Sequence, residues 1–212
     1  MAQKAFIVGG AGTTVTLDDI LKVVHGNEIA LDHSASDRVK KESPPPKAFQ
    51  AEEPPGHAPA VEACLDPQQT RAALLYKLLA LINGRSKVRL AVVEALAGFL
   101  NSGVLPCLPA RAESDRQALS SLAAALQGLG TALNASSGSL CSMGDGLGQA
   151  GLTAPGLSVA ERAVVEDGQS VSGGTGAICV QAGKQLLAGA NAVAALGAEA
   201  LQADVSAHWG LA

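Results

Sequence analysis

Apolar residues recur at helical spacing through most of the chain, and several of these runs begin at a recognisable capping residue. The clearest run begins at Asp66, because aspartate caps helix starts and Pro67 suits the first helical position. Apolar residues then follow at every third or fourth position until Asn83 and Gly84, which favour a stop. The pattern therefore predicts a helix from Asp66 to about residue 83.

Other runs predict further helices and a few extended segments. Thr16 is placed to cap a helix that ends near Gly26, and the capping-box pair Ser158 and Glu161 opens a short helix toward Glu166. Longer helices are predicted at about residues 90–100, 113–129 and 176–204. The remaining segments are expected to be extended at residues 27–32 and 104–109, and to form one or two helical turns at residues 34–41.

Composition favours a mainly α fold with short extended segments. Hydrophobic residues make up 48% of the 212 residues but aromatic residues only 2%, so the core must be built from alanine, leucine and valine. Alanine and leucine favour helix, and small side chains let helices pack closely. The 24 glycines are expected mostly in turns, helix caps and tight crossings.

Prolines and glycines divide this helical pattern into three regions. Residues 43–59 are rich in proline and can sustain neither a helix nor a central strand. We therefore expect an N-terminal helix and extended segment at 1–42, a proline-rich linker or arm at 43–64 and a helical core at 65–212. Within the core, residues 130–156 are rich in glycine and serine, and we expect a loop with short helical pieces there.

Charge and cysteine content exclude several classes of function. The net charge of −4, with 16% charged residues, lacks the basic surface that nucleic-acid binding requires. No cysteines form a CxxC pair and no histidines share a metal-site spacing, so we expect no zinc site, no other metal and no cofactor. Free thiols in a reducing compartment are expected. The cysteines are Cys64, Cys107, Cys141 and Cys179.

The apolar stretches predict neither a membrane span nor a signal-peptide core. A span needs about 20 mostly apolar residues, and the most apolar long stretch, residues 176–201, carries Lys184 and Glu199 among its polar side chains. The first ten residues contain only a short apolar run. We therefore expect a cytoplasmic protein.

The short apolar run Phe6–Val8 is followed by Gly9, Gly10 and Gly12, which hints at a dinucleotide-binding turn. That motif needs a third spaced glycine, which is absent, and a strand-helix-strand unit, which the sequence does not predict. A flexible terminus is therefore the favoured interpretation.

Well over half of the chain resembles a known family of enzymes. Four short segments follow one another in a characteristic order: Arg71–Leu81, Gly84–Arg89, Val92–Glu94 and Leu100–Gly103. This order resembles that of the aromatic amino acid ammonia-lyases, which include the histidine and phenylalanine ammonia-lyases. The resemblance extends to residues 15–32 and 158–201, and it implies a partial ammonia-lyase-like helical bundle.

The sequence departs from this resemblance where the chemistry would lie. In the family, a strand with proline leads into a loop whose contiguous Ala-Ser-Gly cyclises to a methylidene-imidazolone electrophile. Residues 104–109 resemble that lead-in, but Ser114 is followed by Asp115 instead of glycine. Asp167, followed by Gly168, stands where the resemblance places an active-site asparagine, and its charge would repel a substrate carboxylate.

The family's catalytic tyrosine is also missing from its implied place. The loop that would carry it falls in the proline-rich stretch, and the single tyrosine, Tyr76, lies inside a predicted helix. We therefore expect Tyr76 to belong to the core or to a helix interface. Together the departures predict a truncated, catalytically degenerate chain.

From these departures we expect a protein that is not an enzyme and has no catalytic residue, with a degenerate former site at Ser114, Asp115, Asp167 and Gly168. Its expected function is that of a non-catalytic, ammonia-lyase-like structural or interaction subunit of a larger cytosolic assembly. A cytoskeletal or ciliary (axonemal) assembly is one candidate. Two alternatives stay open: a regulatory pseudo-subunit of an active lyase oligomer, and a small-molecule binder or enzyme with a remodelled pocket.

The expected partners are proteins, with neither nucleic acid nor membrane among them and no small-molecule ligand identified. The proline-rich arm would bind as an extended chain, and tryptophan is common at the centre of interfaces. The candidate interaction residues are Pro44, Pro45, Pro46, Phe49 and Trp209.

Overall fold

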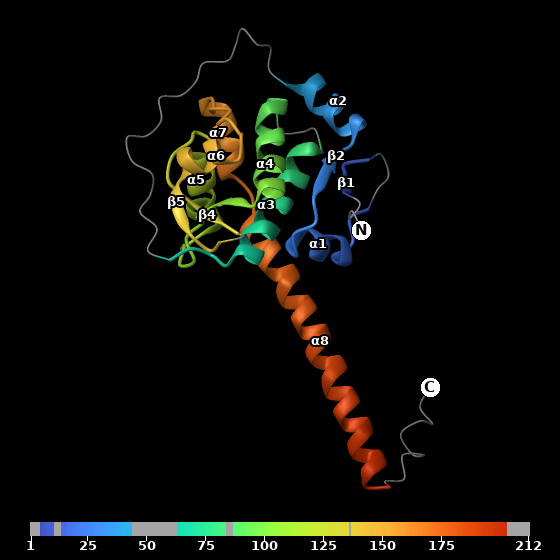
Figure 1. Cartoon of the computed structure of the whole chain (residues 1–212). Helices are drawn as coiled ribbons and strands as arrows, with labels where there is room; N and C mark the ends of the chain where they lie inside the picture. Colours follow the sequence, from blue (N-terminus) through green and yellow to red (C-terminus); the bar gives the residue numbers. More distant parts are fainter. Residues whose placement is uncertain (1–4, 11–13, 44–62, 84–86, 136, 203–212) are drawn as a thin grey trace. The chain divides into compact units, whose positions relative to one another are not determined.

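The computed structural model describes residues 5–10, 14–43, 63–83, 87–135 and 137–202. The chain divides into two compact units, residues 1–177 and 178–212. Both are built mainly from α-helices, as the sequence predicts (Figure 1). The candidate interaction residues of the proline-rich arm and of the tail lie outside the described residues, and so does most of the arm itself.

The eight helices of the described ranges begin mostly where the capping signals predict. In chain order they are α1 (Leu17–Val24), α2 (His33–Glu42), α3 (Pro67–Ile82), α4 (Leu90–Ser102), α5 (Asp115–Ala125), α6 (Met143–Gln149), α7 (Val159–Glu166) and α8 (Ser170–Ala200). Thr16 and Ser158 each complete a capping box, and the Asp66 carboxylate accepts a hydrogen bond from the Gln68 backbone N–H at 2.6 Å.

Two predicted helices differ in length from the observed ones. The helix expected at 113–129 ends at Ala125, and the helix expected from residue 176 begins at Ser170. The early start of α8 has a physical cause, because the Asp115 carboxylate supplies a cap for its first turn from elsewhere in the chain. Among the described helices, none is both long and apolar enough to cross a bilayer.

Strand β1 (Phe6–Val8) pairs in parallel with β2 (Ile29–Leu31), and α1 connects them. The expectation of a flexible terminus without a strand-helix-strand unit is therefore wrong for Phe6–Val8. Asn101 of α4 fixes the second strand, because its side-chain amide both donates to and accepts from the Ile29 backbone, at 2.9 and 2.8 Å. This small sheet is thereby bonded to the helical core.

A second sheet lies where the sequence predicted mostly loop. Strands β3 (Val104–Pro106), β4 (Thr131–Asn134) and β5 (Leu140–Ser142) form an antiparallel sheet in that order. Helix α6 packs on this sheet at Gly146, where a Cβ atom would lie 3.0 Å from the Val104 side chain. Residues 130–156 are thus more regular than expected. The small residues that predicted a loop are the ones that allow α6 to pack closely on the sheet.

The core of the first unit is centred on α3 and α4, with the β1–β2 sheet to one side and α5, α6 and α7 to the other (Figure 1). Leu74, Leu75, Leu78, Leu96 and Phe99 are fully buried between these elements. Apolar side chains on almost every face of α3 explain why so many of its residues are inaccessible to water.

The first turns of α8 cross α3 at very close range. A Cβ atom on Gly174 would lie 2.7 Å from the Ala73 backbone nitrogen, so only glycine fits there. At Gly173 the added atom would lie 3.0 Å from the Tyr76 ring. Tyr76 therefore lies at a helix interface, as predicted, and the two glycines fix where α8 begins relative to α3.

Two cysteines expected to be free thiols are joined instead. Cys64 and Cys107 form a disulfide, with their Cα atoms 5.1 Å apart. The flanking backbone is paired as well, because the Leu65 N–H donates to the Leu108 carbonyl at 2.7 Å. The residues before α3 are thus attached to the end of β3. The prediction missed this pair because it considered only CxxC spacing, and these cysteines lie 43 positions apart.

Candidate functional site

Two of the predicted site residues lie where the loop after β3 meets α5: Ser114 ends this loop, and Asp115 is the first residue of α5. Ser114 caps α5, since its hydroxyl accepts a hydrogen bond from the Gln117 N–H at 3.3 Å. The Asp115 carboxylate accepts from the backbone N–H groups of Val171 and Ser172, both at 2.9 Å, and from the Ser172 hydroxyl. A single carboxylate therefore joins the starts of α5 and α8.

This bonding places Asp115 where two helix N-termini converge. The N–H groups at a helix start are unpaired within the helix and carry partial positive charge, so a carboxylate is favourable there. Asp115 is partly accessible to solvent, so its carboxylate could also contact a ligand. Asp115 thus has a defined structural task in addition to lining the site.

A hollow of about 490 Å³ opens beside these residues. Its walls come from the start of α3, the loop before α5 and the first turns of α8. The polar side chains among its described lining residues are Gln69, Glu113, Ser114, Asp115, Ser172 and Thr175. Carboxylates, hydroxyls and an amide thus dominate the polar part of the hollow, a set suited to a ligand that donates hydrogen bonds.

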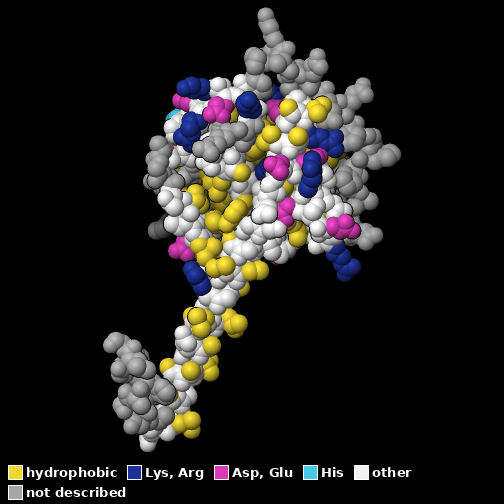
Figure 2. All heavy atoms as spheres, turned by 180° about the vertical axis from the view of Figure 1, so that it is seen from behind, with side chains coloured by type: hydrophobic (Ala, Val, Ile, Leu, Met, Phe, Trp, Pro, Cys, Tyr) yellow, Lys and Arg dark blue, Asp and Glu magenta, His cyan; other side chains and the backbone are white. Residues whose placement is uncertain are grey.

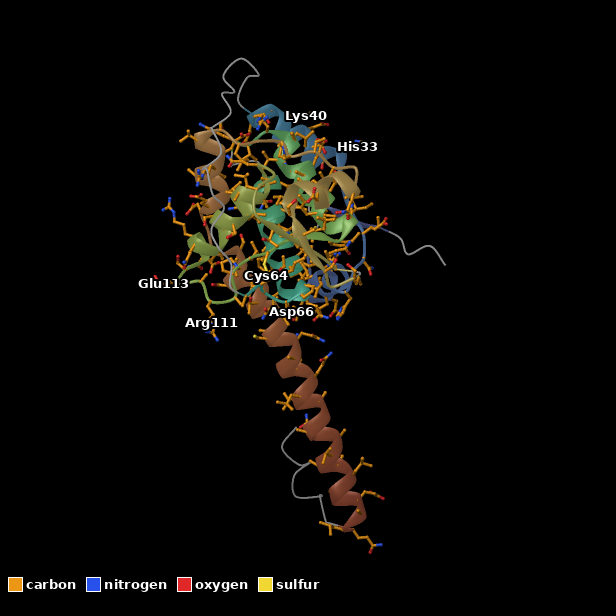
Figure 3. All side chains as sticks on the ribbon, turned by 60° about the vertical axis from the view of Figure 1, so that its left-hand side comes forward. His33, Lys40, Cys64, Asp66, Arg111 and Glu113 are labelled. Atoms are coloured by element: carbon orange, nitrogen blue, oxygen red, sulfur yellow. A yellow bond between two sulfur atoms is a disulfide. The ribbon has the colours of Figure 1, made fainter. Side chains whose placement is uncertain are left out.

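The disulfide supports one wall of this hollow. Leu65 and Pro109 both line the hollow. Leu65 directly follows the disulfide-bonded Cys64, and Pro109 lies two residues after the disulfide-bonded Cys107. In Figure 3, Cys64 and Asp66 lie at the start of α3, while Arg111 and Glu113 extend outward from the loop. The wall is therefore covalently fixed, and the loop carrying Glu113 faces solvent.

Asp167 and Gly168 are not among the described residues that line this hollow. Asp167 ends α7, and its backbone carbonyl accepts a hydrogen bond from the Lys77 ammonium at 2.6 Å. The same ammonium donates to the Val164 carbonyl at 2.7 Å. The structure therefore brings Ser114 and Asp115 together but does not add Asp167 and Gly168 to their site.

Lys77 is a buried cation that sequence reasoning missed. The residue is 3% exposed, and this burial lowers its pKa to about 8, against a smaller opposing effect of the Asp167 charge. The ammonium holds the last turn of α7, where carbonyl groups lack helical partners. The sequence signal that could have predicted this buried cation is a lysine within an otherwise apolar helical run.

Arg71, six residues before Lys77 on α3, has a similar role. Its Nε donates to the Val23 carbonyl at 2.8 Å and one terminal nitrogen to the Leu100 carbonyl at 2.9 Å. These carbonyls belong to the last turns of α1 and α4, whose partial negative charge favours a cation. Burial lowers the pKa of the Arg71 guanidinium. Both cations of α3 therefore hold helix ends in place.

Glu161 joins the start of α7 to the start of α4. Its carboxylate is 1% exposed and accepts from the Arg89 Nε at 2.8 Å and from the Arg89 backbone N–H at 2.9 Å. The Ser158 N–H donates to it at 3.0 Å. Burial raises the pKa of Glu161, but these hydrogen bonds outweigh burial and leave the pKa below its ordinary value.

The loop before α5 does not fit the methylidene-imidazolone electrophile that the family resemblance implies. Cyclisation needs the residue after serine to offer an unobstructed backbone nitrogen, and glycine serves this best. Here Asp115 stands after Ser114, begins α5 and has its side chain bonded to α8. In the described ranges, no group of three or more His, Cys, Asp or Glu side chains is arranged to hold a metal ion.

The fold is that of a mainly helical lyase. A histidine ammonia-lyase from Trypanosoma cruzi matches 96% of this chain and 45% of its own, with a TM-score of 0.82 and 21% identity. A phenylalanine aminomutase from Pantoea agglomerans matches 86% of this chain and 41% of its own, with a TM-score of 0.74 and 19% identity. At these identities the likeness concerns the fold alone.

Sequence comparison defines the family. The model of the family described as aromatic amino acid lyase matches residues 33–208, so the chain belongs to that family. A histidine ammonia-lyase from Geobacillus kaustophilus is 35% identical over 155 residues, which are 71% of this chain and 30% of that protein. A histidine ammonia-lyase from Caldanaerobacter subterraneus is 30% identical over 190 residues, which are 88% of this chain and 37% of that protein. The chain thus spans about a third of the length of these relatives.

This membership contradicts the prediction that the protein is not an enzyme. The relatives are named histidine ammonia-lyase, and the matching folds are those of ammonia-lyases and aminomutases. The prediction rested on the missing Ala-Ser-Gly, on the missing catalytic tyrosine and on Asp167 in place of an asparagine. Missing residues in part of a site do not remove a chain from an enzyme family.

Proposed function

We propose that this chain works within an aromatic amino acid lyase that releases ammonia from an amino acid such as histidine. In that enzyme it supplies the framework of α3, α4, α5 and α8, and residues outside this chain supply the electrophile. The observation that carries the proposal is the fold match, in which nearly all of this chain corresponds to 45% of the T. cruzi enzyme.

The loop at Ser114 and Asp115 supports this division of roles. The loop follows a strand that ends in proline and precedes a helix, as the resemblance implies, yet its residues are engaged in capping α5 and α8. Its contribution would therefore be to fix the two helix starts that border the hollow. The reacting group would come from a lyase-family polypeptide that retains Ala-Ser-Gly, which makes such a polypeptide the expected partner.

Co-purification tests the proposal directly. The tagged full chain is expressed with a full-length histidine ammonia-lyase from the same source, and the purified complex is assayed for ammonia release from histidine. We expect the lyase to be recovered with the tagged chain and the complex to be active. Recovery of the tagged chain without the lyase, together with lyase activity unaffected by it, would contradict the proposal. A cytoskeletal or ciliary location stays a prediction, for which the named relatives give no support.

The hollow favours a second candidate function, the binding of a small molecule that carries an ammonium group. Glu113 and Asp115 supply two carboxylates, and Ser114 and Thr175 supply hydroxyls around a volume that fits an amino acid. Titration calorimetry with histidine checks this candidate. We expect heat of binding for the unmodified chain and a much weaker signal for E113Q, whereas equal binding by both proteins would exclude this use of Glu113.

A further inference from the structure

The disulfide between Cys64 and Cys107 joins two backbone segments that the fold holds side by side, one before α3 and one after β3. Two backbone hydrogen bonds flank it, and their donors are the N–H groups of Leu65 and Ala110, at 2.7 and 2.8 Å. Two such bonds contribute little to stability, because water competes for the same groups. The disulfide is therefore the main attachment between the two segments at this point.

Each cysteine also has a neighbouring anchor that does not depend on the disulfide. Asp66 caps α3 two residues after Cys64. On the other side, the Cys107 N–H donates to the Thr131 carbonyl of β4 at 2.9 Å. Because α3 and the β3–β4–β5 sheet hold the two positions, opening the disulfide need not unfold the protein. The separated thiols also stay close together, which favours closing the bond again.

The two sulfur atoms differ in their access to solvent. Cys64 is partly exposed, whereas Cys107 is 5% exposed, so a soluble thiolate reaches the Cys64 sulfur. Attack there forms a mixed disulfide between the soluble thiol and Cys64 and expels the Cys107 thiolate, which takes up a proton. A second soluble thiolate then attacks the soluble half of the mixed disulfide. The Cys64 thiolate leaves and is protonated, and the two soluble thiols depart as one oxidised disulfide.

We propose that the Cys64–Cys107 disulfide is a reversible redox switch for the loop of residues 108–114, opened by a soluble thiol and closed by the corresponding soluble disulfide. Ser114 and Asp115 fix the far end of this loop through the caps of α5 and α8, and the disulfide fixes its near end. Opening therefore frees one end of the loop and detaches it from Leu65, which lines the same hollow. The switch thus controls the shape of the hollow, whatever molecule binds there.

Hydrogen exchange of the full chain in glutathione buffers of rising reduced-to-oxidised ratio tests the switch. Alkylation and mass spectrometry measure the fraction of chains in which Cys64 and Cys107 are free thiols. We expect this fraction to rise with the ratio and to fall again when the ratio is lowered. In the reduced chain the amides of Leu65 and Ala110 should exchange at least about tenfold faster, because only hydrogen bonds still hold them. Amides of α4 are the reference and should keep their rates.

Trypsin gives a second readout, because Arg111 is an exposed residue of the same loop (Figure 3). Proteases cleave a segment after it has opened locally, so the cleavage rate follows the population of the open loop. Lys184 provides the internal reference, since it is the single basic residue of α8, a helix along which hydrophobic side chains are visible (Figure 2). We expect reduction to accelerate cleavage after Arg111 and to leave cleavage after Lys184 unchanged.

Two variants separate the effect of this disulfide from that of the other cysteines. C64S cannot form the bond, so in every buffer it should show the fast exchange and cleavage of the reduced chain. C141S/C179S is the matched control, because it replaces the two cysteines that are free thiols in the structure. We expect this control to follow the unmodified chain at each glutathione ratio.

Three results would each overturn the proposal. A disulfide that stays closed in the most reducing buffer would contradict the exchange route through Cys64. A general loss of helix on reduction, measured by circular dichroism, would identify a structural disulfide instead of a switch. Unchanged exchange and cleavage in the reduced chain would show that the loop is held without the bond. None of these readouts depends on ammonia release or on a lyase partner.

Discussion

The ammonium of Lys77 makes the stability of this protein depend on pH in the alkaline range. Its pKa is lowered from an ordinary 10.5 to about 8, first because the side chain is buried. The folded state therefore binds the proton less tightly than the unfolded state. Between these two pKa values the unfolded chain holds more protons, so stability rises as the pH increases through that window.

The magnitude follows from the shift. One pKa unit corresponds to about 1.4 kcal/mol, so the interval from about 8 to 10.5 gives an upper value of about 3 kcal/mol. The charged amine costs this much at pH 7 relative to the neutral amine. Deprotonation keeps both hydrogen bonds, because a neutral amine still offers two N–H groups to the Val164 and Asp167 carbonyls.

Urea unfolding of the unmodified chain and of K77M from pH 7 to 10.5 measures this effect. We expect the free energy of unfolding of the unmodified chain, relative to K77M, to rise by up to about 1.4 kcal/mol per pH unit above pH 8. K184M, which removes an exposed lysine of α8, is the control and should follow the unmodified chain. A difference between the unmodified chain and K77M that stays constant across this range would refute the reasoning.

Three further predictions concern helix ends and crossings. D115N keeps the shape of the side chain but loses the charge bonded to the start of α8, and we expect urea unfolding to show a loss of about 1–2 kcal/mol. E161Q should cost about 2–3 kcal/mol at pH 7, because it breaks the buried pair with Arg89. Since the pKa of Glu161 is lowered, its contribution is complete above about pH 4.5 and is lost as the pH falls below that value, so the two proteins should converge in acid. G174A should lower the midpoint of thermal unfolding by several degrees, because its Cβ would lie 2.7 Å from a backbone nitrogen, whereas G189A, with open space around it, should not.

The elements that the sequence predicts best are those fixed by neighbouring residues. Asp66 with Pro67, and Ser158 with Glu161, act within a single turn, so their helix starts are visible in the sequence and are found in the structure. The start of α8 was misplaced because its cap, Asp115, lies more than fifty residues earlier in the chain. A local sequence pattern cannot reveal a capping residue that only the folded structure brings next to the helix start.

The same limit explains what was missed at the candidate site. The Ser114 and Asp115 pair was found through the family resemblance, and Asp167 was added to it although it does not line the same hollow. Lys77 stands in a strongly apolar helix, where a sequence pattern assigns a charge to the surface by default. Its burial depends on carbonyl groups at the end of α7, about ninety residues away. Such pairings become visible only once the helices are packed.

The disulfide has a consequence for how the chain comes apart. It closes a covalent ring from Cys64 to Cys107 that contains both central helices, α3 and α4. Closing a ring of this size removes about 4 kcal/mol of chain entropy from the unfolded state in a simple loop model. A protease that cuts once inside the ring would leave its two products linked, and they would separate on a gel only after treatment with a thiol reductant.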